Sequence, residues 1–454
     1  MKKLLYVAIL ALGVVAMMTP PVMAQEEKPF TIHGEIRYRG EYDNNTSDFD
    51  DNADDGGLFW PYRVRIAAEG KFTKNVSTWI EFQNAGVAGN GINGPQRFGD
   101  SFGTGVGVEL YQGNVTFDQL WSKNFSLRIG RQEIVAGNEL LLGDLDFYAG
   151  MSHDGAVGNW KLKKVNLMLW YTRPVEGQVA SITGGALPPD QIFINPGTGS
   201  GTQNFLGGYA TWTFNKTQTF DVYLMELVNR GTGGNMQTVG VRYAHETTGT
   251  GFFWDIEGVG QVGQVSSALV TGGANDVDAK GNAFEGWFGY SIKSGKKTHR
   301  FYGRLESASG DKSNTAGKNE GFQPLFGDFH NRLGHGDWFQ MSGNLGGPTN
   351  LGGGVPGNAS GIQGLSAGYT GYFNDRHEFG VALWQYKVAE ENTAGNGKKL
   401  GTATDVWYGF NYSRNVNFTV SLSQLSPDDA LTGTGPGTLT DNVTRLYGQA
   451  RLRF

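Results

Sequence analysis

Hydrophobic and polar residues alternate strictly over the last twelve positions of the chain. Leu446, Leu452 and Phe454 would lie on one face of an extended strand, and Arg445 and Arg451 on the other, because successive side chains of a strand point to opposite faces. The polar face carries three arginines in all. A soluble sheet would have to bury these charges, whereas the wet interior of a membrane barrel accommodates them. The pattern predicts a membrane-spanning strand.

The same alternation appears near the start of the chain. Within residues 30–43, Ile36 and Tyr38 alternate with Arg37 and Arg39. We count about eighteen segments of this kind, and each can supply the ~9–11 residues that a tilted membrane strand needs.

The connections between these segments also alternate, between short turns and long loops. Short turns are expected near residues 72–75, 163–164, 215–216, 247–249, 294–297, 374–376 and 414–417. Long loops are expected near residues 44–57, 85–104, 135–153, 175–203, 264–280, 311–360 and 427–442. This rhythm predicts an all-β fold: a transmembrane antiparallel up-and-down β-barrel of about 18 strands, with short periplasmic turns and long extracellular loops. Both termini should lie at the short-turn rim.

Two soluble architectures fit the pattern less well. A β-propeller or β-helix is also rich in glycine and short strands, but it should show a repeated internal motif, which we do not find. A β-sandwich buries its inner faces and should not place Arg and Glu at alternate strand positions.

The start of the chain has the pattern of a secretory signal peptide. Two lysines precede an apolar run over residues 4–18, which is shorter than a membrane span, and small residues then allow cleavage after Ala24. We expect residues 1–24 to be removed and residues 25–454 to form a single barrel domain in the outer membrane of a Gram-negative cell.

Composition excludes several other classes of protein. The chain has no cysteine, which excludes a lipidated N-terminal cysteine, disulfides, covalent c-type haem and thiolate metal sites. It has 71 glycines, 13% aromatic and 18% charged residues, a mixture that suits many short strands with aromatic girdles. The net charge of −6 gives no sign of nucleic-acid binding.

The first, second and last strands become neighbours when the barrel closes, and their inward faces are rich in arginine. We call this set the arginine wall: Arg37, Arg39, Arg63, Arg65, Arg445, Arg451 and Arg453. Further inward arginines are predicted at Arg128, Arg242, Arg300 and Arg304, and inward carboxylates at Glu35, Glu69, Glu81, Asp255, Glu257 and Glu306. Such a wall can select anions in a wet pore. Alternatively, Arg–Glu ladders only stiffen the barrel.

Several sequence blocks resemble the outer-membrane alginate export family. They are LRIGRQEIVAGNELLLGDLDF from Leu127, HDGAV from His153, RVRIAAEGKFTKNVSTWIEFQNAG from Arg63 and ESASGDKSNTAGKNEGFQPLFGDFH from Glu306. The most specific parts are Arg131-Gln132 and Ser309-Gly310-Asp311. The terminal Phe is also similar to the last residue of outer-membrane proteins that the assembly machinery recognises. The resemblance implies an 18-stranded barrel with an electropositive pore for an acidic polysaccharide.

The resemblance also implies a role in the pore for Arg131. This residue shares the outward parity of Leu127 and Ile129, so it reaches the lumen only through a bulge or beyond the membrane. Asp154 could then pair with it on an inward loop. We expect residues 135–153 to fold into the lumen and narrow it.

No pattern points to catalysis or to a cofactor. None of the seven histidines has paired metal-ligand spacing, and His153-Asp154 is the only fragment of a hydrolytic triad. The acidic loop at residues 48–55 lacks EF-hand spacing, so it is interpreted as solvated or as bridged by cations to lipopolysaccharide. We expect no enzyme, no metal and no cofactor, and contact with outer-membrane lipids and lipopolysaccharide.

These observations predict an outer-membrane channel of the alginate-export type that passes anionic solutes or an acidic polysaccharide. Two alternatives remain. The barrel could be a sleeve for an electron-transfer or secretion partner, including a periplasmic one, or it could be a nonspecific diffusion porin.

Overall fold

The computed structural model describes residues 30–46, 49–52, 56–88, 108–175, 203–229, 234–266, 276–312, 317–328, 330–342, 360–391, 397–432 and 440–454. The predicted signal peptide lies outside these residues, so it stays a prediction.

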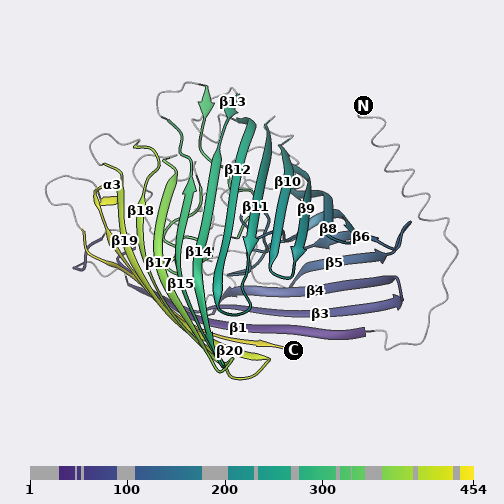
Figure 1. Cartoon of the computed structure of the whole chain (residues 1–454), viewed down its shortest axis with the longest axis horizontal. Helices are drawn as coiled ribbons and strands as arrows, with labels where there is room; N and C mark the ends of the chain where they lie inside the picture. Colours follow the sequence, from purple (N-terminus) through teal and green to yellow (C-terminus); the bar gives the residue numbers. More distant parts are fainter. Residues whose placement is uncertain are drawn as a thin grey trace.

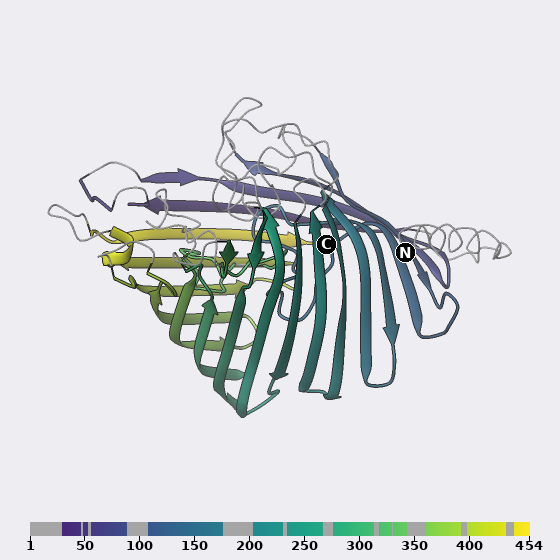
Figure 2. The ribbon, with the colours of Figure 1, turned by 90° about the horizontal axis from the view of Figure 1, so that it is seen from above.

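An 18-stranded antiparallel barrel closes on itself. Each barrel strand pairs with the next along the chain, and the last strand pairs with the first from Glu35↔Arg453 to Asn44↔Thr444. In Figure 2 the purple β1 and the yellow β21 lie side by side at this seam. The predicted up-and-down barrel is therefore confirmed, and so is its strand number.

The barrel strands are β1 (Phe30–Asn44), β3 (Pro61–Thr73), β4 (Val76–Val87), β5 (Glu109–Asp118), β6 (Phe125–Gln132), β7 (His153–Lys161), β8 (Val165–Val175), β9 (Gln203–Asn215), β10 (Gln218–Asn229), β11 (Asn235–His245), β12 (Gly251–Ser266), β14 (Asn282–Ser294), β15 (Lys297–Ala308), β17 (Ile362–Phe373), β18 (His377–Lys387), β19 (Lys399–Asn411), β20 (Val416–Pro427) and β21 (Val443–Arg453). They form the wall in Figure 1.

Among the described residues, three short strands and one helix belong to the long connections. They are β2 (Gly57–Phe59), β13 (Asp276–Ala279), β16 (Lys318–Asn319) and α3 (Asp429–Thr432). Within the described residues, no helix is long and apolar enough to cross a membrane.

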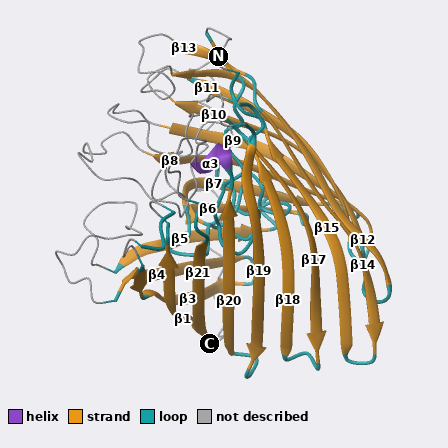
Figure 3. Ribbon diagram, turned by 90° about the vertical axis from the view of Figure 1, so that its left-hand side faces the viewer, coloured by secondary structure: helices purple, strands orange, loops and turns teal. Residues whose placement is uncertain are grey.

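The two rims differ as predicted. Figure 3 shows the short turns that join β17 to β18 and β19 to β20 at the rim where the chain ends. The predicted short turns all join consecutive strands. One further short connection, residues 119–124 between β5 and β6, was not predicted, because its sequence lacks a Gly-, Pro- or Asn-rich turn signal in the first positions.

The two faces of the barrel wall are as different as the alternation predicts. On β1, Ile36 and Tyr38 face outward and are 41% and 49% exposed, whereas Arg37 and Arg39 face inward and are 5% and 2% exposed. Outward apolar side chains are suited to contact with the lipid bilayer. The low exposure of Arg37 and Arg39 shows that other parts of the protein, and not open water, cover them.

The seam between β1 and β21 depends on a close approach of Phe454 to Gly34. The two residues exchange backbone hydrogen bonds of 2.8 and 3.0 Å, and a Cβ atom at Gly34 would overlap the Phe454 ring. A Cβ atom at Gly448, on the neighbouring β21, would meet no atom within 4 Å.

We expect Gly34→Leu to destabilise the barrel by about 1–3 kcal/mol, because overpacking displaces the terminal ring from the seam. Gly448→Leu is the matched control and should leave stability close to wild type. The temperature at which the folded band disappears on unheated denaturing gels measures the difference. Equal temperatures for the two variants would show that the seam does not depend on this contact.

Candidate functional site in the barrel lumen

The arginine wall is covered by the chain itself. Residues 133–152, which we call the first inner segment, follow β6 and fold into the lumen. Arg37 donates hydrogen bonds to the backbone carbonyl oxygens of Asp146 at 2.6 Å and Tyr148 at 2.5 Å. Arg63 donates a second bond to the Asp146 carbonyl oxygen at 3.0 Å. Arginines of two adjacent strands thus bind one turn.

The remaining carbonyl groups of this turn are bound in the same way. Arg39 donates to the carbonyl oxygen of Phe147 at 2.7 Å, and its guanidinium carbon lies 3.6 Å from the centroid of the Phe147 ring. Arg65 donates to the carbonyl oxygen of Ala149 at 2.8 Å. All four consecutive carbonyl oxygens of residues 146–149 therefore accept hydrogen bonds from the arginine wall.

The side chain of Asp146 supplies the negative charge. Its carboxylate lies 2.5 Å from Arg63, 3.1 Å from Arg65 and 3.0 Å from Arg451. Burial alone would raise the pKa of Asp146, but Arg63, Arg65 and Arg37 hold that pKa below its ordinary value. The carboxylate is consequently ionised at neutral pH and fixes the first inner segment to the wall.

Glu41 of β1 supplies the negative charge that neutralises Arg39 and Arg445 of the arginine wall. Its carboxylate accepts hydrogen bonds from Arg39 at 2.8 Å, Arg445 at 2.7 Å and the Tyr148 hydroxyl at 2.9 Å. Because Glu41 is fully buried, loss of these donors would leave an uncompensated charge, which is costly.

A β-bulge on β5 joins the first inner segment to the wall from the other side. The β4–β5 register shifts between Glu81 and Phe82, which directs Tyr111 inward. The Tyr111 ring lies 3.9 Å from the guanidinium carbon of Arg65, and its hydroxyl donates to Glu133 at 2.5 Å. Burial raises the pKa of Glu133 to about 7.

A second inner segment, residues 317–328 and 330–342, packs against the first. Leu142 and Phe326 form a parallel bridge between the two segments, with hydrogen bonds of 2.7 and 3.0 Å around it. Arg332 donates to the carbonyl oxygen of Asn138 at 2.8 Å and forms an ion pair with Glu285 of β14. The leucines and phenylalanines of both segments join the inward side chains of the barrel in one apolar core.

The Ser309-Gly310-Asp311 motif attaches the second inner segment to the barrel. Ser309 accepts a hydrogen bond from the Asn282 backbone at 2.9 Å and donates one to the Glu320 carbonyl oxygen at 2.6 Å, while Asp311 accepts one from the Glu320 backbone at 2.9 Å. A Cβ atom at Gly310 would overlap the backbone of Ser360. The motif is thus structural at this position.

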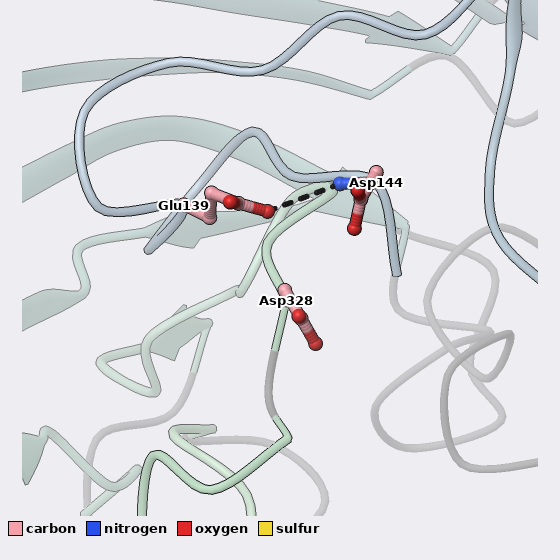
Figure 4. A group of neighbouring side chains, drawn as sticks. All are labelled: Glu139, Asp144 and Asp328. Carbon is pink, nitrogen blue, oxygen red and sulfur yellow. Dashed lines mark hydrogen bonds between the residues drawn. The ribbon is translucent and has the colours of Figure 1, made fainter. Parts of the chain in front are cut away.

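Three carboxylates meet where the two inner segments touch (Figure 4). Glu139 and Asp144 belong to the first segment and Asp328 to the second, and their oxygen atoms lie within 4.8 Å of one another. Burial raises the pKa of all three groups, and the neighbouring carboxylates raise it further for Glu139 and Asp144. Protonation of these three carboxylates therefore stabilises the contact between the first and second inner segments.

The other predicted inward residues do face the lumen, and most of them are paired. Arg128 donates to the Glu133 carbonyl oxygen at 2.8 Å, Arg242 pairs with Asp221 at 2.8 Å and Asp255 at 2.6 Å, Arg304 pairs with Glu306 at 2.7 Å, and Arg300 pairs with Glu246.

Arg131 and Asp154 are the two predicted pore residues that the structure places elsewhere. They lie opposite each other on β6 and β7 in a regular register, so Arg131 shares the outward face of Ile129. Arg131 donates two hydrogen bonds to Asp154, at 2.9 and 2.7 Å, and the side chains are 42% and 54% exposed. The bulge that would turn Arg131 inward lies on β5 instead, at Tyr111.

The sequence interpretation missed the residues that bind the wall from within the lumen. These are Tyr111, Glu133, Asp146 and Tyr148. Arg332, which joins the first inner segment to Glu285 of β14, was missed as well. The available signal was the run of buried-type leucines ending in two aspartates at residues 140–146, which is unusual for a solvated loop.

This geometry defines a class: a closed membrane barrel whose lumen is narrowed by inward-folded segments, as in porins. The family model described as alginate export matches residues 28–444. The chain therefore belongs to the alginate export family. No curated protein matches the chain in sequence.

Solved outer-membrane proteins share the fold. Pseudomonas aeruginosa OpdL is similar with a TM-score of 0.58 and 9% identity over 94% of this chain and 98% of OpdL. Acinetobacter baumannii OccAB1 has a TM-score of 0.58 and 10% identity over 96% and 99%. Pseudomonas aeruginosa OpdK, solved with vanillate, has a TM-score of 0.52 and 13% identity over 93% and 99%. At these identities the likeness shows the fold alone.

We expect Asp146→Asn to weaken the free energy that holds the first inner segment against the arginine wall by about 2–3 kcal/mol. The reason is that three arginines lose a shared carboxylate, which is only partly shielded from water. The chain has no cysteine, so Met151→Cys can report the release through its rate of maleimide labelling. The rate should rise at least about tenfold.

Asp144→Asn is the matched control for that variant, two residues away. It removes a carboxylate that repels Glu139 and Asp328, so labelling should stay slow or become slower. Faster labelling in both variants would show that any change in this turn loosens it.

Docking of the first inner segment should strengthen as the pH falls from 8 to 5. Glu133 has a pKa of about 7 when buried and about 4.3 in water, so the docked state binds the extra proton across this window. The gain is about 2–3 kcal/mol at pH 5 relative to pH 8. Labelling of Met151→Cys, corrected for the ionisation of the free thiol, should slow accordingly.

The glutamine of Glu133→Gln cannot titrate, so this variant should reduce the change in labelling rate between pH 8 and pH 5. An unchanged pH dependence in Glu133→Gln would assign it to the cluster at Glu139, Asp144 and Asp328 instead.

Proposed function

We propose that this chain is an outer-membrane channel of a Gram-negative cell that passes anionic solutes or an acidic polysaccharide. The observation that carries the proposal is the arginine wall, which spans the inward faces of β21, β1 and β3. From the turn at residues 146–149 the wall binds four carbonyl oxygens and the carboxylate of Asp146, and from the barrel strands it binds the carboxylates of Glu35 and Glu41. These are the hydrogen-bond acceptors that an anionic sugar would offer.

The first inner segment therefore occupies the position that an anionic solute would take. When it moves away, Arg37, Arg39, Arg63 and Arg65 face the pore without their present partners in the turn. Arg453, which is already 60% exposed in its side chain, lies at the short-turn rim and attracts anions into the lumen. Membership of the alginate export family and the porin fold support a channel rather than an enzyme.

The identity of the solute separates the remaining candidates. OpdK was solved with vanillate, an organic anion, which agrees with the chemistry of the wall. A nonspecific porin would pass anions and cations alike, so the selectivity of the current separates it from the proposal. A sleeve for a partner protein would need both segments to leave the lumen.

We expect anion selectivity in planar bilayers, with block of the current by uronate oligomers. Arg37→Ala combined with Arg65→Ala should weaken the selectivity and raise the open conductance, because the same two arginines hold the first inner segment. Lys216→Ala, in a short turn outside the lumen, is the control and should change neither. Reversal potentials in a salt gradient measure the selectivity.

Cation selectivity in the wild-type channel would contradict the proposal. A barrel that never conducts, even in the double variant, would favour the role of a sleeve for a partner.

A further inference from the structure

A separate cavity of about 220 Å³ lies beneath the second inner segment, against the inward faces of β14, β15, β17, β18 and β19. It lies beside the arginine wall, with β20 between its last strand, β19, and β21 of the wall. Five of its thirteen lining residues are aromatic: Trp287, Tyr302, Tyr372, Trp384 and Trp407. Polar side chains such as Arg304, Thr370 and Glu378 line it as well, and small-molecule sites combine aromatic faces with convergent polar groups in this way.

The cavity is open toward the short-turn rim. A smaller hollow of about 150 Å³ shares Arg300 and Tyr372 with it and is also lined by Glu246 and Thr247, which follow β11. A solute that enters from the periplasmic side therefore reaches this cavity before it reaches the inner segments.

The positive charges of the cavity already have partners. Arg304 donates to Glu306 at 2.7 Å and to the Asn331 carbonyl oxygen at 3.1 Å. Its guanidinium carbon lies 5.6 Å from the centroid of the Trp287 ring and 5.6 Å from that of Trp384. Arg300 is likewise paired, with Glu246. The described lining residues of the cavity thus offer no unpaired cation that would bind an anionic ligand.

The cavity also contains a carboxylate of its own. Glu378 accepts a hydrogen bond from the Trp407 indole at 2.9 Å and remains part of the cavity wall. A negative group at this position opposes an anionic ligand, but it readily accepts hydrogen bonds from hydroxyl groups.

Several buried nitrogen atoms in the cavity wall lack partners. Among the described residues, those without a hydrogen-bond partner include the indole nitrogen of Trp287 and Nδ1 of His335. His335 stacks on Trp407 with ring centroids 4.3 Å apart, and burial lowers its pKa to about 3, so it is neutral. Each unpaired buried polar group costs about 1–3 kcal/mol. Both nitrogen atoms are closed to water in the present packing, so a ligand hydroxyl group recovers this cost once a rotation of the ring brings the nitrogen to the cavity surface.

We propose that this cavity binds the ring of an uncharged sugar, with its C–H face on the indoles and its hydroxyl groups at Trp287, His335 and Glu378. Indole faces supply apolar contact, while the paired donors and acceptors match hydroxyl groups, which both donate and accept. The volume is below the ~300–1,000 Å³ of sites for drug-sized ligands, so it suits about one ring. The site is independent of anion selectivity in the arginine wall.

Saturation-transfer NMR on the full-length barrel in detergent micelles tests this proposal without any conductance measurement. The probes are methyl α-glucopyranoside, glucuronate and benzoate, which separate an uncharged sugar, an acidic sugar and a planar carboxylate. We expect transfer to the ring protons of the glucoside, with an affinity at least about threefold above that for glucuronate or benzoate.

Trp287→Phe keeps the aromatic ring but removes the indole donor, and we expect it to weaken glucoside binding about three- to tenfold. Trp79→Phe on β4 is the matched control, since its indole nitrogen bonds to Glu81 at 3.0 Å outside the cavity, and binding should not change. Glu378→Gln is a second variant in case Trp287→Phe does not fold, with an expected weakening of about threefold.

Three results would overturn the proposal. One is the absence of transfer to the glucoside. Another is binding of glucuronate or benzoate as tight as that of the glucoside. The third is equal glucoside affinity in the wild type, Trp287→Phe and Glu378→Gln. None of these results bears on whether the open channel selects anions.

Discussion

The arrangement of the lumen depends on the hydrogen bonds between the arginine wall and the turn at residues 146–149. Guanidinium groups carry five donors and keep their charge at any pH that the protein meets. Burying them costs several kcal/mol for each ion unless acceptors surround them. Four carbonyl oxygens, Asp146, Glu41 and Glu35 provide those acceptors. The wall therefore needs the inner segment as much as the segment needs the wall.

This mutual dependence explains why the lumen is both charged and largely dry around the wall. On one side, arginines and carboxylates form a network in which each charge has a partner. On the other side, Phe205, Trp170 and Val157 of the barrel pack on Leu142 and Phe326 of the inner segments. The inner segments join these two environments, so movement of either segment must break polar and apolar contacts together.

The junction between the inner segments responds to protons in the same direction as Glu133. Protonation of Glu139, Asp144 and Asp328 removes repulsion across the Leu142–Phe326 bridge, and protonation of Glu133 removes the cost of burying its charge. Acid thus favours the docked state at both places. Asp146 acts in the opposite sense, but its lowered pKa keeps it ionised well below the pH at which the other groups bind protons.

The sequence alone was sufficient for the barrel. Strict alternation over β1 and β21 assigned each side chain to lipid or lumen, because a strand has a period of two and the two solvents differ sharply. It also identified the arginine wall, and the family resemblance pointed to residues 135–153 as an inward loop. Only the tertiary structure showed what the arginines bind. Asp146 and Tyr148 lie at least 81 positions along the chain from the wall residues that they contact, and Arg332 lies 47 positions from Glu285. Several of these bonds also go to backbone carbonyl oxygens, which no side-chain pattern records. It also showed that the bulge lies on β5, where a single extra residue turns Tyr111 inward, and not on β6, so that Arg131 keeps the outward parity of its sequence pattern. In the same way, the terminal strand alone indicated a membrane barrel, whereas the partners of Arg445 and Arg451 were decided by how the rest of the chain folds into it.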